Sequence, residues 1–312
     1  MTNNMNIAIV LVTFNRLQSL KESLKRYEDQ TKKPKYILVV DNASQDGTLE
    51  YLQNWQKKPI HGIIKKVVYS SKNLGGSGGF ALGIKEAFSL DCDFLFLADD
   101  DAMADPDMLE QLNKGYVNLL KDGKRQISAL CTAIYNFDRH EYLHRCNVRK
   151  GFGIKFVGLS EKCYKQKYFH MEILSFVGAC ISKSAIIKIG NVKTKYFIYY
   201  DDSDYSIRLN KVGDIYCIPK SIMHHDIGNN RVSSWKAYYD TRNWIDLVKT
   251  HFSKYELYCT VFKTYVKRCS FLATIARGRS RAFRKMCLIA IKDGLNNNLG
   301  VNEKYKPGKK IE

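Results

Sequence analysis

Short apolar runs alternate with longer stretches of helical periodicity through the first third of the chain. Such runs are typical of buried strands when amphipathic helices separate them. The expected strands are Ile7 to Thr13, Tyr36 to Val40, Val67 to Tyr69 and Phe94 to Leu97, and the expected helices are Leu17 to Gln30, Thr48 to Gln56 and Phe80 to Phe88. This alternation predicts an α/β fold with a Rossmann-like, mostly parallel sheet flanked by helices.

Polar residues follow each of these four strands. In open parallel sheets, ligands bind beyond the carboxyl ends of the strands. The polar residues are Thr13, Asn15 and Arg16 after the first strand, Asp41 and Asn42 after the second, Asn73, Gly75 and Gly76 after the third, and Asp99 and Asp101 after the fourth. Their convergence predicts a ligand site at this edge of the sheet.

The remainder of the chain divides into two regions. Between residues 127 and 218, β-like runs such as ISALCTAIY, FVGACI and DIYCIP are expected to extend the sheet in mixed sense. Near residue 230 the composition changes to a helix rich in Trp and Tyr, followed by a basic segment. We therefore expect a catalytic domain over residues 1–230 and a helical, basic C-terminal region over residues 231–312.

The composition of the 312 residues is that of a globular protein, with 45% hydrophobic and 26% charged residues. The nine cysteines are scattered without a CxxC pair, which fits a reducing compartment better than a disulfide framework. Neither a signal peptide nor a run long enough to span a bilayer is evident. The expected location is the cytoplasm, with peripheral contact to the inner face of the cell membrane as an option.

A net charge of +19 needs a partner or a surface, and basic residues are concentrated after residue 252. Three interpretations stay open for this segment: an anionic membrane surface, a nucleic acid, or a solvated tail packed on the core. Acidic clusters at converging strand ends would repel phosphates, so a nucleic-acid-binding protein is disfavoured as the overall function. A homo-oligomer is a further option.

The most informative motif is the triplet Asp99, Asp100 and Asp101 in FLFLADDDA. Clustered carboxylates repel one another unless water or a cation meets them, and hard oxygen ligands suit Mg²⁺ or Mn²⁺. The alternative is an acidic turn before a helix, with Asp105 as N-cap and Pro106 as first helical residue.

Two further motifs accompany the triplet. The run NLGGSGGFALG, which contains Gly75 and Gly76, would let a backbone approach a bulky ligand and present helix N-terminal amides to an anion; a flexible turn is the alternative. Asp41 would hydrogen-bond a base or a sugar, or would only form an Asx turn.

The second acidic cluster, Asp201, Asp202 and Asp204, precedes an amphipathic helix, where one Asp would be an N-cap or a base that deprotonates a hydroxyl. Tyr199 and Tyr200 before it would offer a flat surface for a sugar. The following pair in IMHHDIG, His224 and His225, would be core histidines, or one of them would complete a metal shell.

Taken in order, TFNR, DNAS, NLGGSGGF, LADDDA, DDSDYSIR and HHDIG resemble the motifs of inverting family-2 glycosyltransferases with the GT-A fold, over roughly residues 6 to 230. The resemblance implies a nucleotide-sugar donor and a divalent metal, Mn²⁺ or Mg²⁺. It implies a donor site of Thr13, Arg16, Asp41, Gly75, Gly76, Asp99 and Asp100, metal ligands Asp99, Asp101 and His225, the general base Asp202, and an acceptor site of Tyr199, Tyr200 and Asp201. His224 competes with His225.

Within that family, NLGGSGGF followed by DDDA looks most like the galactofuranosyltransferases, which use UDP-galactofuranose; a rhamnosyltransferase using dTDP-rhamnose is the alternative. The chain is much shorter than the long galactofuranan polymerases and has Tyr200 where those have Trp, so addition of one or few residues is expected. The resemblance also implies a lipid-linked glycan acceptor of capsule, O-antigen or cell wall. A non-catalytic glycan-binding module is the alternative from another class.

Overall fold

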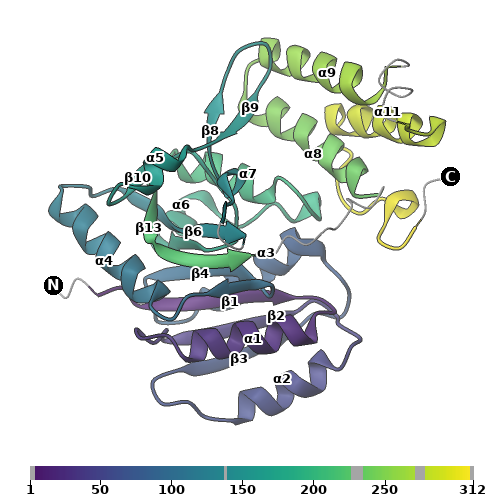
Figure 1. Cartoon of the computed structure of the whole chain (residues 1–312). Coiled ribbons are helices and arrows are strands. Elements are labelled where there is room, and N and C mark those ends of the chain that lie inside the picture. Colours follow the sequence, from purple (N-terminus) through teal and green to yellow (C-terminus); the bar gives the residue numbers. More distant parts are fainter. Residues whose placement is uncertain (1–3, 137–138, 226–234, 271–277, 310–312) are drawn as a thin grey trace.

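A single mixed sheet forms the centre of the computed structural model, which describes residues 4–136, 139–225, 235–270 and 278–309 (Figure 1). Its strand order is β10-β13-β6-β12-β4-β1-β2-β3. The bounds are β1 Ile7–Thr13, β2 Tyr36–Asp41, β3 Ile64–Tyr69, β4 Phe94–Asp99, β6 Ile127–Asn136, β10 Phe169–Met171, β12 Ala179–Ser182 and β13 Asp214–His225. Two short strands, β5 (Ala102–Ala104) and β7 (Arg139–His140), pair with β13 and β6.

The predicted mixed sense of this sheet is confirmed. β1 pairs in parallel with β2 and with β4, and β3 continues the parallel half beside β2. β12 is antiparallel to both β4 and β6, whereas β13 runs parallel to β6. The chain order reverses between β1 and β4, and such a switch point opens a crevice at the carboxyl ends of the two strands.

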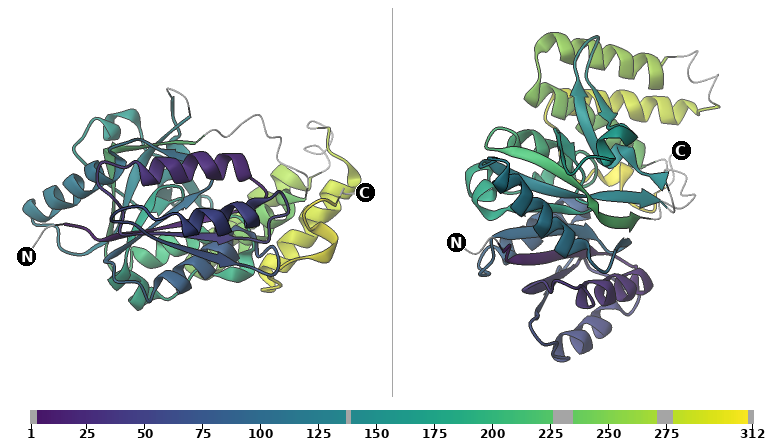
Figure 2. Two further views of the ribbon diagram at one scale, coloured as in Figure 1. Left: turned by 90° about the horizontal axis from the view of Figure 1, so that it is seen from below. Right: turned by 60° about the vertical axis from the view of Figure 1, so that its left-hand side comes forward.

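Helices cover both faces of the sheet and enclose two apolar cores (Figures 1 and 2). The helices α1 (Leu17–Glu28), α2 (Thr48–Lys57) and α4 (Met108–Lys121) bury their apolar sides against one face. The helices α3 (Gly75–Ala87), α6 (Lys183–Ile189) and α7 (Asp201–Leu209) bury theirs against the other. The strands are therefore apolar on both sides, which explains their continuous hydrophobic runs.

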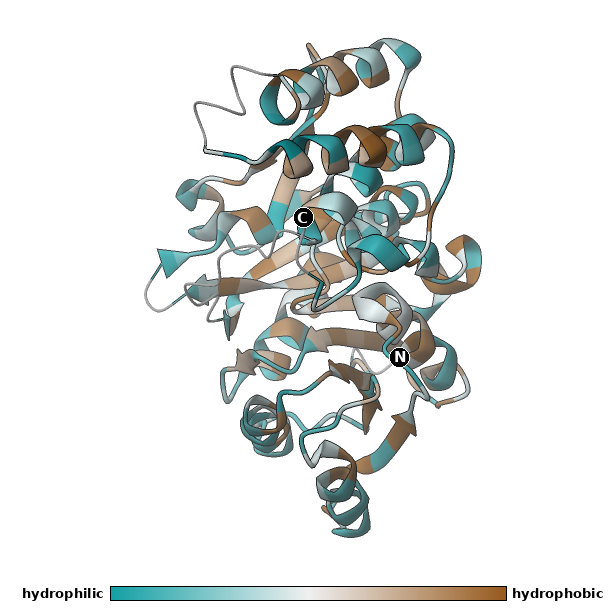
Figure 3. Ribbon diagram, turned by 90° about the vertical axis from the view of Figure 1, so that its right-hand side faces the viewer, coloured by the Kyte–Doolittle hydropathy of each residue, from teal (hydrophilic) through white to brown (hydrophobic). Residues whose placement is uncertain are grey.

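A small antiparallel sheet and three helices lie beyond this α/β body. The small sheet has the order β11-β8-β9, with bounds β11 Ile173–Leu174, β8 Arg145–Arg149 and β9 Lys155–Gly158. The remaining short elements of the described chain are α5 (Glu161–Tyr164), η1 (Tyr142–His144), η2 (Thr194–Tyr196) and η3 (Glu303–Tyr305), of which η1 contacts the small sheet. The three helices, α8 (Lys236–His251), α9 (Lys254–Arg268) and α11 (Arg281–Leu295), enclose a third core, and Figure 3 shows apolar and polar positions alternating along them.

The basic C-terminal segment is thus packed on the rest of the chain through this third core, as one of the three open interpretations predicted. The expected boundary near residue 230 lies outside the described residues, as do Asp226, Ile227 and Gly228 of the HHDIG motif. Among the helices in the described part of the chain, none has the length and apolar character needed to cross a membrane.

Two expected helix starts are wrong. α3 begins at Gly75, not at Phe80, so most of the glycine run is helical. Close packing explains those glycines: a Cβ on Gly79 would lie 2.5 Å from Cγ1 of Val12, and one on Gly83 would lie 2.4 Å from Cγ1 of Val10. α4 begins at Met108 with Asp107 as N-cap, so Asp105 and Pro106 belong to the preceding turn.

Candidate active site

The aspartate triplet lies at the crevice between β1 and β4. Asp99 is the last residue of β4, and the buried carboxylate of Asp100 accepts a hydrogen bond from Thr13 Oγ1 at 2.6 Å. The half-exposed Arg16 guanidinium donates to Asp100 at 3.2 Å and also to Asp101. The bonds from Thr13 and Arg16 to Asp100 therefore tie the ends of β1 and β4 together.

Crowding of negative charge perturbs this triplet. Burial, followed by the charges of Asp101 and Asp100, raises the pKa of Asp99 to about 7. Burial raises the pKa of Asp100 to about 6, although Thr13 and Arg16 oppose that shift. Burial would also raise the pKa of Asp101, but the neighbouring His225 and the charge of Arg16 outweigh burial and lower it.

The two adjacent histidines of β13 have different partners. His224 Nε2 lies 3.0 Å from Asp105 Oδ1, in the turn before α4. His225 Nε2 lies 3.4 Å from Asp101 Oδ1, and burial of His225 is outweighed by Asp101 and Asp99, so its pKa is raised. His225 is therefore the histidine that faces the triplet.

The donor atoms at this place suit a divalent cation. Asp101 Oδ1 and His225 Nδ1 are both buried and form no hydrogen bond. Carboxylate and imidazole groups are ligands for Mn²⁺ and Mg²⁺, and Mg²⁺ takes one or two carboxylates together with substrate phosphates. Within the described residues, no three His, Cys, Asp or Glu side chains are already close enough together to hold a metal ion. An ion held by Asp101 and His225 would therefore need further ligands, such as the oxygens of a bound diphosphate.

A cavity of about 300 Å³ opens beside the triplet. The predicted donor-site residues that line it are Thr13, Arg16, Gly75, Gly76, Asp99 and Asp100, and further lining residues include Asn42, Asn73, Phe197, Ile198, Trp235 and Lys236. Gly76 leaves space at this cavity, since a Cβ built on it meets nothing within 4 Å. The first turn of α3 presents backbone at the cavity, a position suited to an anion.

Asp41 does not line this cavity, whereas its neighbour Asn42 does. Asp41 is buried at the end of β2 and accepts a hydrogen bond from Ser44 N at 3.0 Å, the Asx-type turn that was one of the alternatives. Asn42 joins β2 to the start of α3 by accepting from Leu74 N at 2.9 Å and donating to Gly75 O at 3.1 Å.

The second acidic cluster begins α7. Burial, followed by the charge of Asp202, raises the pKa of Asp201 to about 8. Burial also raises the pKa of Asp202 from its ordinary 3.8 to about 6, against two hydrogen bonds from Ser203 and the charge of Arg145. Asp204 instead pairs with Arg208 and with His251, so it is engaged in holding α7. Asp202 is partly exposed, unlike its buried neighbours Asp201 and Ser203, and its pKa is near that of a working base.

The segment before α7 has an unusual backbone. Phe197, Tyr199 and Tyr200 all have positive φ, at 67°, 66° and 64°. Such conformations cost about 1–3 kcal/mol each in bulky residues and persist only where surrounding structure imposes them. The segment 197–200 is therefore held in place by its neighbours.

Two elements hold this segment. On one side, Ser77 N of α3 donates to Phe197 O at 3.1 Å, and Gly75 permits the approach because its φ is +71° and a Cβ would lie 2.2 Å from that oxygen. On the other side, Asn243 Nδ2 of α8 donates to the carbonyl oxygens of Tyr196, Ile198 and Tyr199 at 3.0, 2.7 and 3.1 Å.

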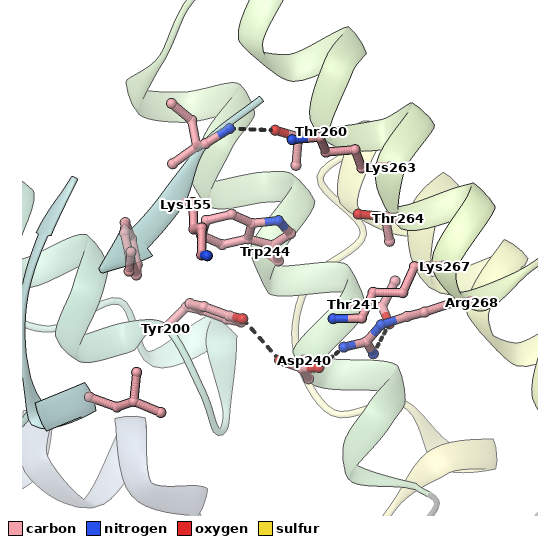
Figure 4. Close-up of a pocket in the computed structure, with 13 residues that line it drawn as sticks. Lys155, Tyr200, Asp240, Thr241, Trp244, Thr260, Lys263, Thr264, Lys267 and Arg268 are labelled. Carbon is pink, nitrogen blue, oxygen red and sulfur yellow. Dashed lines mark hydrogen bonds and ion pairs between the residues drawn. The ribbon is translucent and has the colours of Figure 1, made fainter. Parts of the chain in front are cut away.

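A second cavity, of about 580 Å³, lies beside Tyr200 (Figure 4). Tyr200 lines it, with its ring 5.2 Å from that of Trp244 and its hydroxyl donating to Asp240 at 3.0 Å. The other lining residues include Phe156, Lys155, Lys263, Lys267 and Arg268, and Arg268 pairs with Asp240. Segment 197–200 thus lines both cavities, with Phe197 and Ile198 at the first and Tyr200 at the second.

The family model described as "Glycosyl transferase family 2" matches residues 8–190, more than half of the chain. The chain belongs to this family. The predicted family and GT-A fold are therefore confirmed, and this glycosyltransferase contains strands β1 to β4 and the aspartate triplet within the matched range.

Relatives of this glycosyltransferase include galactofuranosyltransferase GlfT1 from Mycolicibacterium smegmatis, 38% identical over 113 residues, which are 36% of this chain and 35% of that protein. Another is a cholesterol galactosyltransferase from Borreliella burgdorferi, 30% identical over 106 residues, 34% of this chain and 28% of that protein. The matches thus span about a third of the relatives' length.

Solved structures of the same fold include S. aureus TarS, with a TM-score of 0.61 and 14% identity, covering 96% of this chain and 50% of TarS. The mannosyltransferase PcManGT from Pyrobaculum calidifontis, solved with GDP-Man and Mn²⁺, has a TM-score of 0.58 and 14% identity, covering 95% and 88% of the two chains. At this identity the likeness concerns the fold.

Sequence reasoning did not find several residues that the structure places around the two cavities. Trp244 and Lys155 line the second cavity, and Asn243 holds the segment before α7. Two of these, Asn243 and Trp244, lie in the segment YYDTRNW of α8. Arg242 and Asn243 in it are both buried, which is uncommon for such polar residues but becomes visible only in the structure.

Proposed function

We propose that this glycosyltransferase transfers galactofuranose from UDP-galactofuranose to a glycan, with inversion of the anomeric configuration. Family membership supports sugar transfer, and the named relatives GlfT1 and cholesterol galactosyltransferase support a galactose-type donor. The single observation that carries the assignment of roles is the position of Asp202. Asp202 itself lines neither cavity, but it stands two residues after Tyr200 at the start of α7, and segment 197–200 contributes lining residues to both cavities, which supports a base close to donor and acceptor.

In this proposal the first cavity binds the donor nucleotide. Thr13 and Arg16 hold Asp100 at the crevice, Asn42 and Asn73 offer amide groups at the wall, and Gly75 and Gly76 bring the start of α3 close to the diphosphate. Asp41 was expected to bind the base of the nucleotide. In this proposal it acts instead through the turn that positions Asn42.

A divalent metal ion would be held by Asp101 and His225, with Asp99 beside them. Such an ion would supply positive charge to the leaving diphosphate. Asp101 Oδ1, which lies 3.4 Å from His225 Nε2, and the buried His225 Nδ1, which forms no hydrogen bond, support this position, and PcManGT, a structure of the same fold, was solved with Mn²⁺. His224 is bonded to Asp105, which supports His225 as the ligand.

Asp202 would take the proton from the acceptor hydroxyl while that oxygen attacks the anomeric carbon. Burial keeps its pKa near 6, so the carboxylate is ionised at neutral pH yet basic enough to accept a proton. Asp201, with a pKa of about 8, stays protonated at neutral pH, so Asp202 carries the charge of the pair.

The second cavity would bind the acceptor glycan. Its aromatic side chains, Tyr200, Trp244 and Phe156, can stack on sugar rings, and its four basic residues outnumber the one carboxylate, Asp240. An anionic group on the acceptor, such as the phosphate of a lipid-linked glycan, would suit this lining. Tyr199 is exposed at the edge of the same segment, whereas Asp201 is buried at the start of α7. A role in bacterial cell-surface polysaccharide synthesis in the cytoplasm would follow.

The donor is tested by measuring UDP or dTDP release and binding with UDP-galactofuranose, UDP-galactopyranose, UDP-glucose and dTDP-rhamnose, with and without Mn²⁺. UDP-galactofuranose is expected to be bound most tightly and turned over. Exclusive use of dTDP-rhamnose would refute the proposed donor and leave the family assignment unchanged. Glycan binding without turnover of any donor would instead favour a non-catalytic module.

The role of Asp202 as general base is tested with Asp202→Asn, which keeps the size of the side chain and removes its basicity. Turnover is expected to fall by at least about 10²-fold while UDP binding stays unchanged. Asp204→Asn is the control, because Asp204 pairs with Arg208 and His251 on the same helix and its loss should lower stability more than turnover. Full turnover by Asp202→Asn would refute the assignment.

A further inference from the structure

One side of helix α9 exposes large apolar side chains. Tyr255, Tyr258, Phe262, Tyr265 and Val266 are 63%, 69%, 57%, 42% and 44% exposed. At about 100° per residue these five positions fall within an arc of about 100°. We call them the exposed face of α9. The apolar residues are therefore gathered on one side of the helix, although the sequence alone did not separate apolar from basic positions.

The opposite side of α9 packs against the rest of the protein. Thr260 and Thr264 are buried there, and α9 packs against α8 and α11. Burial of that side explains the fold of the helix, but it does not explain five exposed apolar residues on the other side. An apolar patch of this kind on a soluble surface marks an interaction site.

The tip of the β8–β9 hairpin extends this patch. Ile154 N donates to Thr260 Oγ1 at 3.1 Å, which fixes the hairpin on α9. Phe152 at the tip is 53% exposed, and its ring lies 6.1 Å from that of Phe262. The exposed face of α9 and Phe152 therefore form one continuous aromatic surface.

The charges around this surface are positive. Lys254, Lys263 and Lys267 of α9 are exposed, and so are Arg149 and Lys150 of the hairpin. The one carboxylate of α9, Glu256, is buried and accepts hydrogen bonds from Ser253 in a capping box. Aromatic rings surrounded by lysines match the interface of a bilayer with anionic head groups.

We propose that the exposed face of α9, with Phe152, docks onto an anionic lipid bilayer. Charge complementarity favours lipid over a second copy of the chain, because a two-fold contact would bring the same lysines of both copies together. The same helix lines the second cavity through Lys263 and Thr264. If that cavity binds the acceptor as proposed above, docking holds it within about one helix diameter, 10–12 Å, of the lipid head groups.

The test is sedimentation of the full chain with vesicles of phosphatidylcholine alone or mixed equally with phosphatidylglycerol. Binding is expected only with phosphatidylglycerol and should weaken as salt is raised. Tyr258→Ser/Phe262→Ser should weaken it by at least about tenfold. The control Leu49→Ser/Ile187→Ser removes two exposed apolar side chains from α2 and α6 and should bind like the wild type.

A second pair of variants separates charge from apolar contact. Lys150→Gln/Lys254→Gln should weaken binding to phosphatidylglycerol vesicles by about tenfold or more. Lys188→Gln/Lys211→Gln changes the net charge equally at exposed sites elsewhere and should have little effect. Thermal unfolding checks that each variant is folded.

Three results would overturn the proposal. They are absence of binding to phosphatidylglycerol vesicles, wild-type binding by Tyr258→Ser/Phe262→Ser, and a dimer in light scattering that the same double variant makes monomeric without changing vesicle binding. UDP release from UDP-galactofuranose in solution, measured in parallel, tests sugar transfer separately. Tyr258 and Phe262 line neither of the two cavities, so their substitution leaves the lining of both unchanged.

Discussion

Replacing Asn243 should displace the proposed general base, Asp202, although Asn243 itself lines neither cavity. Asn243 is fully buried in α8, and its Nδ2 serves the carbonyl oxygens of Tyr196, Ile198 and Tyr199. Asn243→Asp keeps the size of the side chain and the oxygen that accepts from Arg242 Nε, but it removes both donors. The substitution therefore isolates the hydrogen bonds to the segment before α7.

The magnitude follows from what the segment loses. Two N–H donors disappear. Tyr196 O keeps its hydrogen bonds from Arg242 Nη2 and Ile198 N. The carbonyls of Ile198 and Tyr199 therefore lose this donor, at about 1–3 kcal/mol for each group. The segment also contains three bulky residues with positive φ, each costing about 1–3 kcal/mol in that conformation, so it gains energy by relaxing. We expect the free energy of unfolding to fall by about 2–4 kcal/mol and the segment to shift. A shift of about 1 Å at Asp202 would lower kcat by about 10²-fold.

The assay compares kcat for UDP release from UDP-galactofuranose, the dissociation constant of UDP and the free energy of unfolding in urea. Asn210→Ala is the matched control. Asn210 Nδ2 also donates to two carbonyl oxygens, of Glu172 and Ser206, but at the other end of α7. The Asn210→Ala variant should be less stable than the wild type but should have the same kcat. Unchanged kcat in a folded Asn243→Asp protein, or an equal loss in both variants, would refute the reasoning.

Two further predictions concern pH and metal. The raised pKa of Asp202 is about 6, and a general base works only when it is deprotonated, so kcat should rise as the pH is raised through about 6. A pH–rate profile in which kcat instead rises near the ordinary carboxylate pKa of 3.8 would contradict this. His225→Ala should weaken Mn²⁺ binding in the presence of UDP by at least about tenfold in calorimetry, whereas His224→Ala, which loses a partner of Asp105, should not; equal effects would count against His225.

Much of the α/β body could be predicted from the chain because buried parallel strands have a one-dimensional signature. β1 coincides with the expected Ile7 to Thr13, and the later β-like runs became β6, β12 and β13. Helix starts were less accurate. The glycines of α3 resembled a loop in sequence, yet two of them are needed where the helix touches Val10 and Val12, and such contacts are properties of the packed structure.

The sequence by itself determined the family, the sheet and the set of polar residues at its carboxyl edge, because periodicity and motif order are encoded locally. Only the tertiary structure decided which of those residues bond to one another and which of them line the cavity. It tied Asp100 to Thr13 and Arg16, turned His225 rather than His224 toward Asp101, and placed Asn42 rather than Asp41 at the cavity. Those outcomes depend on which side chains meet across the sheet.

The same holds for the C-terminal helices. Their basic and apolar composition was visible in the sequence, but composition does not say which side of a helix is covered. Packing of α9 against α8 and α11 buries one side and leaves Tyr258 and Phe262 exposed on the other. Asn243 likewise acquires its role only because α8 lies against the segment before Asp201, contacts between residues more than forty positions apart that no local pattern records.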